Sequence, residues 1–131
     1  MLIKVKDCLV NLGDIKYFVR DELRINKSSS TVHTINILTK CDSKFSTEYI
    51  DQIGTKEEID SIWKNLKNID CLFYEVTPNI LINLQNVSSI LKTSRGLKIT
   101  FIGEKLSNHN LLIHNEELQD IDKILNEMSS F

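Results

Sequence analysis

Residues 10–15 read Val-Asn-Leu-Gly-Asp-Ile, and residues 82–87 read Ile-Asn-Leu-Gln-Asn-Val. Both stretches follow one pattern (apolar, Asn, Leu, any residue, Asp or Asn, apolar), and they lie 72 residues apart. Each is followed by alternating apolar residues, which are typical of strands, and then by apolar residues at steps of three and four, which are typical of an amphipathic helix. The repeated order predicts two related modules in one chain.

The first predicted module covers residues 1–70. Its strands are expected over Ile3 to Leu12, Ile15 to Val19, Thr31 to Thr39 and part of Lys44 to Ile50. Gly13 marks a bend or tight turn between the first two of these segments. Thr55 and Glu58 fit a capping box, so a helix is expected to begin behind Thr55. Its apolar face is formed by Ile59, Ile62, Trp63, Leu66 and Ile69.

The second predicted module, residues 71–131, repeats this order. Its strands are expected at Cys71 to Val76, Ile80 to Leu84, Val87 to Leu91, Leu97 to Ile102 and Leu111 to His114. Pro78 lacks a backbone donor, so the strand before it is expected to stop or reach a sheet edge there. A turn is expected at residues 94–96, and Asn115 is the predicted cap of the last helix. The apolar face of that helix contains Leu118, Ile121, Ile124, Leu125 and Met128.

Runs of strands followed by a helix predict an α+β fold. It is expected to contain two tandem modules, each an antiparallel β-meander followed by a helix, which are related by an approximate internal two-fold repeat. The two modules are expected to form one globular unit. The alternative is a single α+β domain whose two helices share a pattern by chance. A β-α-β crossover into Cys71 to Val76, which would make the sheet mixed, also stays open. The spacing between matching residues falls from 72 to 64 after the second strand. The first module therefore has about eight extra residues, which are predicted to form an inserted hairpin over residues 20–33.

The composition indicates a soluble globular protein, with 41% hydrophobic and 26% charged residues among 131. An uninterrupted apolar stretch long enough to cross a membrane is absent from the sequence, and residues 1–7 alternate apolar and charged side chains, unlike a signal peptide. Three widely spaced cysteines without a C-x-x-C motif predict reduced thiols. A cytoplasmic location is therefore expected. The chain has no alanine but 18 Ile and 12 Asn, a bias of AT-rich genes that suggests a phage or another mobile element.

Motifs for catalysis, metal binding or nucleotide binding are absent from the sequence. His109 and His114 are five residues apart, which does not place them on one helix face, and an H-E-x-x-H motif is lacking. The serines at 28–30 have no G-x-S-x-G context. With four glycines, the chain has no phosphate-binding loop. We therefore expect a non-enzymatic protein without a metal or cofactor.

Nucleic-acid binding is the first alternative function, because small sheets backed by helices often bind single strands. The candidate residues are Lys92, Arg95 and Lys98, around the expected turn in the second module. The net charge of −2 argues against a dominant phosphate-binding surface. Binding of a small molecule between the modules is the second alternative, and it has no sequence signature.

Protein binding or assembly is the favoured function. Sheets of this kind expose edge strands whose free backbone groups recruit another chain unless they are protected. The inserted hairpin keeps apolar residues among charged ones, and its candidate partner-binding residues are Arg20, Leu23, Arg24, Ile25 and Lys27. The expected partner is a protein, either a different one or a second copy in a homo-oligomer, and a membrane is not expected.

Overall fold

A computed structural model describes residues 1–24, 31–40, 49–69, 72–103 and 110–130. These residues form ten strands and two α-helices, and every strand pair is antiparallel, so the predicted α+β class is confirmed and a mixed sheet is not formed. The strands are β1 (Leu2–Val5), β2 (Cys8–Asn11), β3 (Ile15–Arg24), β4 (Thr31–Thr39), β5 (Tyr49–Gly54), β6 (Phe73–Thr77), β7 (Ile80–Asn83), β8 (Val87–Lys92), β9 (Gly96–Phe101) and β10 (Leu111–His114). The helices are α1 (Lys56–Lys67) and α2 (Ile121–Ser129).

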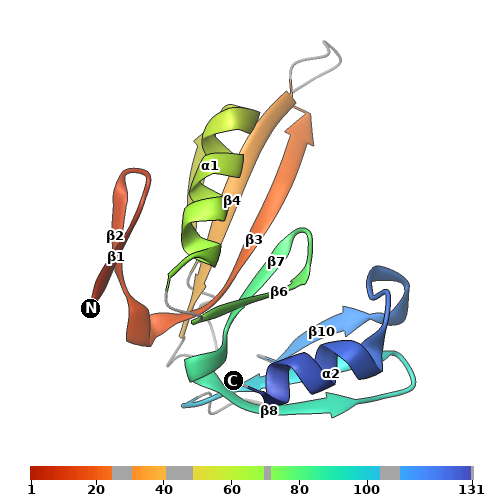
Figure 1. Cartoon of the computed structure of the whole chain (residues 1–131). Coiled ribbons are helices and arrows are strands. Elements are labelled where there is room, and N and C mark those ends of the chain that lie inside the picture. The colour runs from red at the N-terminus through yellow and green to blue at the C-terminus, as the bar shows by residue number, and fades with distance from the viewer. Residues whose placement is uncertain (25–30, 41–48, 70–71, 104–109, 131) are drawn as a thin grey trace.

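The strands form three sheets. The largest has the order β5-β4-β3-β7-β6, the second has the order β10-β9-β8, and β1 pairs with β2 alone. The β6–β7 hairpin from the second half of the chain thus joins the sheet of the first half, and Figure 1 shows it between the α1 and α2 regions. The strand before Pro78 ends at Thr77 and lies at the edge of the largest sheet, as predicted.

Both helices begin at capped N-termini. Thr55 caps α1 as predicted, because its side chain accepts a hydrogen bond from the backbone amide of Glu58 at 3.2 Å. The predicted cap of the last helix was wrong. Asn115 begins a short 3-10 turn that ends at Glu117, and α2 is capped by Asp120, whose carboxylate accepts from the amide of Lys123 at 3.1 Å.

The two halves share one order of elements, namely two strands, a 3-10 turn, three strands and an α-helix, and the second half has an additional 3-10 turn just before α2. The two 3-10 turns occupy residues 12–14 and 84–86, inside the repeated motif. At each turn the preceding asparagine accepts a hydrogen bond from the amide two residues later, at 2.9 Å for Asn11 and 3.2 Å for Asn83. The repeated motif therefore encodes the same bend twice, while a duplication of the whole module stays a prediction.

The first of two buried clusters lies between α1, the largest sheet and the β1–β2 hairpin. Trp63 on α1 is 2% exposed, and the apolar faces of β3 and β4 pack beneath the helix. Phe18 of β3 meets Phe73 of β6 edge to face, with ring centroids 5.2 Å apart. The first core thus includes residues from both halves of the sequence.

The second cluster lies between α2 and the β8–β9–β10 sheet, and it also receives residues from β6 and β7. Tyr17 of β3 stacks on Phe101 of β9 at a centroid distance of 5.7 Å, which joins the two sheets. Gly96 begins β9 at a φ of +151°, where an added Cβ would meet the carbonyl oxygen of Ile113 at 1.9 Å. Only glycine permits β9 and β10 to approach so closely.

Two buried asparagines connect the halves at the bends. Asn83 is fully buried, and its side-chain amide donates to the carbonyl oxygens of Leu12 at 3.1 Å and Ile15 at 2.9 Å. The amide of Asn86 donates to the same Ile15 carbonyl at 2.7 Å and to that of Gly13 at 3.0 Å. Buried amides placed this way satisfy the backbone acceptors of the first bend, so the two motifs position each other.

Candidate protein-binding site

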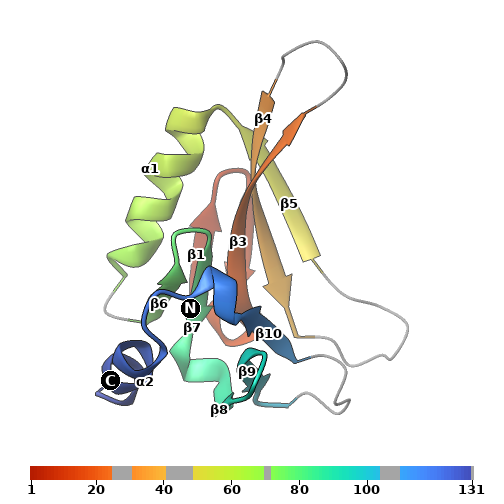
Figure 2. The same cartoon turned by 90° about the vertical axis from the view of Figure 1, so that its right-hand side faces the viewer.

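The predicted insertion extends the β3–β4 hairpin. The pairing of β3 with β4 continues from Phe18 opposite Ile37 to Arg24 opposite Thr31, and Figure 2 shows both strands projecting beyond β7. Ile25 and Lys27 lie outside the described residues, and of Arg24 only the backbone is described.

The predicted partner-binding residues do not share one face. Arg20 points to α1, where its guanidinium lies 4.7 Å from the ring of Trp63, 3.1 Å from the carboxylate of Asp60 and 2.6 Å from the carbonyl of Pro78. These contacts tie β3 to α1 and to the β6–β7 turn. Leu23 is 52% exposed and, three residues further along the strand, lies on the opposite face.

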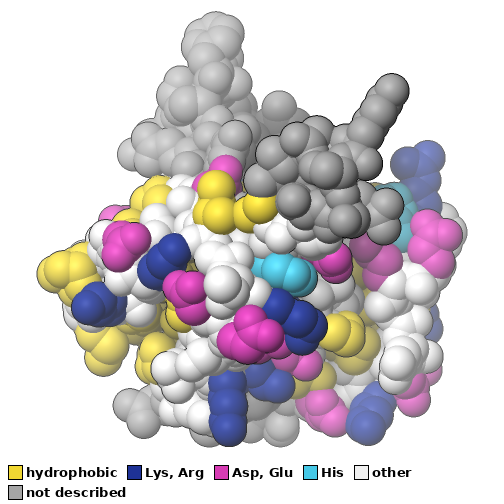
Figure 3. Space-filling view, turned by 90° about the horizontal axis from the view of Figure 1, so that it is seen from above, with side chains coloured by type: hydrophobic (Ala, Val, Ile, Leu, Met, Phe, Trp, Pro, Cys, Tyr) yellow, Lys and Arg dark blue, Asp and Glu magenta, His cyan; other side chains and the backbone are white. Residues whose placement is uncertain are grey.

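A cluster of charged side chains surrounds Arg20 at the N-terminal end of α1. Asp60 contacts Lys56 at 2.7 Å, and this hydrogen bond lowers the pKa of Asp60 and raises that of Lys56. A shallow depression of about 360 Å³ there also includes His33, which lies on β4. Figure 3 shows acidic and basic side chains interspersed around a histidine on this end of the protein. Because the ion pairs satisfy these charges within the protein, we interpret the cluster as structural.

The other face of β3, β4 and β5 carries an open apolar patch. In Figure 2, α1 covers one side of these strands, and no helix among the described residues covers the other. Cross-strand pairing aligns Asp21, Thr34 and Ile53 in one row and Val19, Asn36 and Asp51 in the next. The hollow over these rows has a volume of about 460 Å³. We name it the open patch, and its residues are Val19, Asp21, Leu23, Thr34, Asn36, Leu38, Asp51 and Ile53.

The open patch contains two of the most exposed large apolar side chains in the described part of the chain. Leu23 is 52% exposed and Ile53 is 56% exposed. The charged residues of the patch, Asp21 and Asp51, are both acidic. At the side of the patch, β5 is the edge of the five-stranded sheet, so its outer backbone groups have no strand partner among the described strands. A patch that combines exposed Leu23 and Ile53 with an acidic border of Asp21 and Asp51, next to a free edge, is suited to binding another protein.

Sequence reasoning found Leu23 but missed the other members of the open patch. Val19, Asp21 and Leu23 alternate along β3, and Asp51 and Ile53 alternate along β5, so a period of two could have identified both strands. It could not show that α1 covers only the opposite face.

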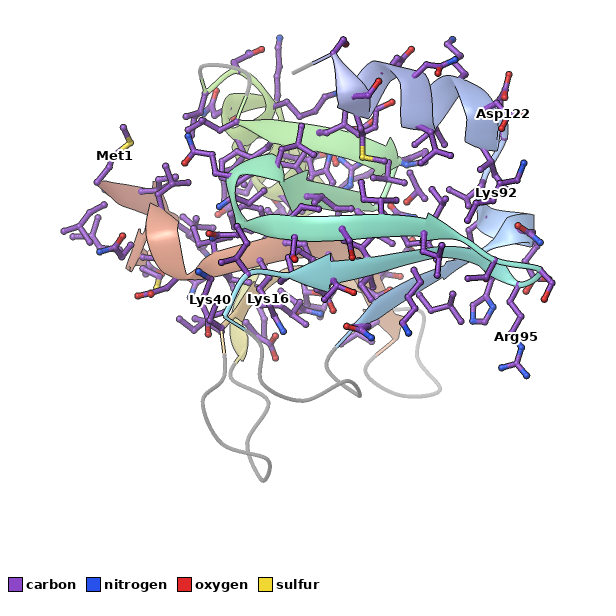
Figure 4. All side chains as sticks on the ribbon, turned by 90° about the horizontal axis from the view of Figure 1, so that it is seen from below. Met1, Lys16, Lys40, Lys92, Arg95 and Asp122 are labelled. Carbon is purple, nitrogen blue, oxygen red and sulfur yellow. The ribbon has the colours of Figure 1, made fainter. Side chains whose placement is uncertain are left out.

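The residues of the nucleic-acid alternative lie around the β8–β9 turn. Lys92 is paired with Asp122 of α2 at 3.3 Å, and Figure 4 shows the two side by side, while Arg95 points away from the protein at the tip of the turn. Lys98 lies on β9 opposite Leu91 and Leu112. Lys92 is therefore neutralised by an acidic partner, and Lys98 is flanked by apolar residues. The three cations do not form a basic strip.

In the described ranges, no three His, Cys, Asp or Glu side chains are grouped so that they could hold a metal ion. None of the helices in these ranges is long and apolar enough to cross a membrane. Cys8 is a half-buried free thiol, and the other two cysteines lie outside the described residues.

Comparison with known proteins finds no matching family model, no significantly similar curated protein and no significantly similar solved structure. A functional proposal for this chain therefore depends on its own surface chemistry.

Proposed function

We propose that this chain is a non-enzymatic protein-binding or assembly protein, and that a partner protein covers the open patch on β3, β4 and β5. The observation that supports this is the exposure of Leu23 and Ile53 together on a sheet face that α1 leaves uncovered. Grouped exposed apolar residues bordered by polar ones are typical of protein interfaces, whereas scattered ones carry no such meaning.

The chemistry of the patch defines the expected partner. Burial of Leu23 and Ile53 requires apolar side chains on the partner, and Asp21 and Asp51 require basic ones nearby. The extended hairpin and the free edge of β5 also allow the partner to add a strand by backbone pairing. The partner is thus an apolar and basic protein surface, and the acidic border disfavours nucleic acid at this site.

Affinity capture from lysate of the source cells tests this proposal. Three forms of the full chain are compared with wild type: Leu23→Ser with Ile53→Ser, Asp21→Lys with Asp51→Lys, and the control Ile102→Ser. Ile102 is 49% exposed and lies outside the open patch, so the control removes a similar apolar side chain elsewhere. Because all five side chains are at the surface, each substitution is expected to change the free energy of unfolding by less than about 1 kcal/mol.

The expected result is one protein, identified by mass spectrometry, that binds wild type and the Ile102→Ser control but neither patch variant. Its binding to purified chain should weaken as salt increases, because the acidic border contributes to it. Capture that is equal for all four forms, or loss in the control as well, would contradict the proposed site.

A further inference from the structure

The β6–β7 hairpin fills the groove between β3 and α1. β7 pairs with β3, and on the helix side Phe73 and Leu81 are 5% and 0% exposed within the same core as Trp63. Glu75 accepts a hydrogen bond from the indole of Trp63 at 2.8 Å and lies 3.0 Å from the ammonium of Lys67. A hairpin from the second half thus completes the core of the first half.

The second half has an open groove at the corresponding place, between β8 and α2. Its volume is about 380 Å³, and its apolar lining residues are Leu84, Val87, Ile90, Leu125 and Met128. Within the described strands, β8 pairs only with β9, so its other edge is free. Ile90 matches Phe18 at the 72-residue spacing, yet Phe18 is fully buried while Ile90 stays partly exposed. The groove thus has the same elements as the filled one, but no hairpin of the described residues occupies it.

The β1–β2 hairpin has the features of the missing occupant. At the same 72-residue spacing β2 matches β7, so Leu9 corresponds to Leu81 and Asn11 corresponds to Asn83. Leu2 lies opposite Asn11 and Phe73 lies opposite Asn83, so Leu2 corresponds to Phe73. Leu2 and Leu9 are 62% and 64% exposed, whereas Phe73 and Leu81 are buried. The outer edge of β2 has no strand partner among the described residues. The hairpin therefore exposes the apolar side chains that its counterpart buries.

Asn11 provides a second, polar match. Its counterpart Asn83 donates to the carbonyls of Leu12 and Ile15, which are bend residues of the other half. Asn11 is exposed, and its side-chain oxygen accepts from the amide of Gly13 just as that of Asn83 accepts from Gln85. No hydrogen bond from the Asn11 amide is found within the described residues. The Asn11 side-chain amide is thus available to donate to the carbonyls of Leu84 and Val87 in another molecule, which match those of Leu12 and Ile15.

We propose that the β1–β2 hairpin of a second copy of this chain occupies the groove between β8 and α2. Strand β2 of that copy pairs antiparallel with β8, in the register that β7 has with β3: Leu91 opposite Cys8, Ile90 opposite Leu9 and Ser89 opposite Val10. Leu9 then packs on Ile90, and Leu2 lies near α2. This contact uses a different surface from the open patch, so failure of either proposal leaves the other intact.

The contact is head-to-tail, because one copy contributes the hairpin and the other the groove. Such an interface leaves a free groove at one end and a free hairpin at the other, so it forms a closed ring or an open filament, depending on the rotation between copies. One departure from the internal pairing lies at Asp14, which matches Asn86 but has no amide to donate. The contact between copies therefore lacks the hydrogen bonds that Asn86 makes.

A disulfide test follows from the predicted register. Arg20 donates its backbone amide to the carbonyl of Asn79 at 2.9 Å, so the neighbouring pair of Val19 and Ile80 is a non-hydrogen-bonded pair with close side chains. Its counterpart between copies is Leu91 and Cys8. Mild oxidation of the full-length Leu91→Cys variant should therefore link copies through native Cys8.

Three controls accompany this test. Wild type lacks the new thiol, Leu91→Cys combined with Cys8→Ser lacks the partner thiol, and Lys92→Cys places a thiol on the other face of β8. Covalent dimers or longer chains on a non-reducing gel are expected only for Leu91→Cys. Equal crosslinking of Lys92→Cys, or of the variant without Cys8, would overturn the proposed pairing, as would a Leu91→Cys protein that forms no crosslink.

Sedimentation velocity over a concentration series tests the direction of assembly. Leu9→Asp removes the hairpin contact and Leu125→Asp removes the groove contact, and either should weaken association about tenfold or more. An equal mixture of the two variants retains one intact interface and should form dimers that neither forms alone, with circular dichroism checking that both are folded. A wild-type chain that stays monomeric at the highest attainable concentration, or a mixture of folded variants that forms no dimer, overturns the proposal.

Discussion

Asn83→Ala is expected to lower the free energy of unfolding much more than Asn11→Ala, although both residues occupy the same place in the repeated motif. The buried side chain of Asn83 makes three hydrogen bonds, two donated to Leu12 and Ile15 and one accepted from Gln85. At about 1 kcal/mol each, their loss amounts to about 3 kcal/mol. The Ile15 carbonyl keeps its hydrogen bond from Asn86, so the full cost of an unsatisfied buried acceptor is not added.

Asn11 is the matched control. It is exposed and accepts a single hydrogen bond from Gly13 at the start of its turn, so Asn11→Ala should cost about 1 kcal/mol. Urea denaturation followed by the fluorescence of Trp63 measures both values, at protein concentrations low enough to prevent association. If the two substitutions have equal effects, or Asn83→Ala costs less than about 1 kcal/mol, the buried amide does not connect the halves as described.

Three further predictions concern single contacts. Trp63→Phe removes the indole hydrogen bond to Glu75, and denaturation monitored by circular dichroism should show a loss of about 1 to 2 kcal/mol. Gly96→Ala should destabilise far more than the control Gly103→Ala, because an added Cβ meets backbone at position 96 and open space at 103, and the ranking of their melting temperatures checks this. Burial, followed by the hydrogen bond to a glutamate, raises the pKa of Tyr74 from 10.0 to about 12. Since the folded state holds this proton more tightly, its stabilising effect is complete below pH 10 and is lost as the pH rises to about 12; the tyrosinate absorbance of wild type minus that of Tyr74→Phe should titrate in this range.

Much of the secondary structure could be predicted because it depends on local patterns. The period of two along residues 31–39 predicts β4, and the capping box at Thr55 predicts the start of α1. The start of α2 was missed because Asn115 and Asp120 are both suitable caps, and the first of them begins only a 3-10 turn. Local signals of similar strength compete, and tertiary packing selects between them.

The candidate site could be predicted only in part. The insertion that extends the β3–β4 hairpin follows from the unequal spacing of the two modules, and Leu23 was expected to be exposed. Arg20 was grouped with Leu23 because the two are close in sequence, yet they lie on opposite faces of β3. The face of β3 that α1 covers could not be predicted from strand periodicity, because each face of this strand has both apolar and charged residues: Phe18 and Arg20 on one face, Val19 and Asp21 on the other.

The sequence by itself determined the α+β class and the two similar bends, since these follow from hydrophobic period, turn residues and helix caps. It left a mixed sheet open, and the tertiary structure decided that the described strand pairs are all antiparallel. Only the tertiary structure decided that β7 pairs with β3, that Asn83 is buried while Asn11 is exposed, and that one groove is filled while the other is open. Strand pairing across the chain depends on backbone edges, which are chemically alike in every strand. The two copies of the repeated motif can therefore have different surroundings, and only strand pairing in the folded chain decides which copy is buried.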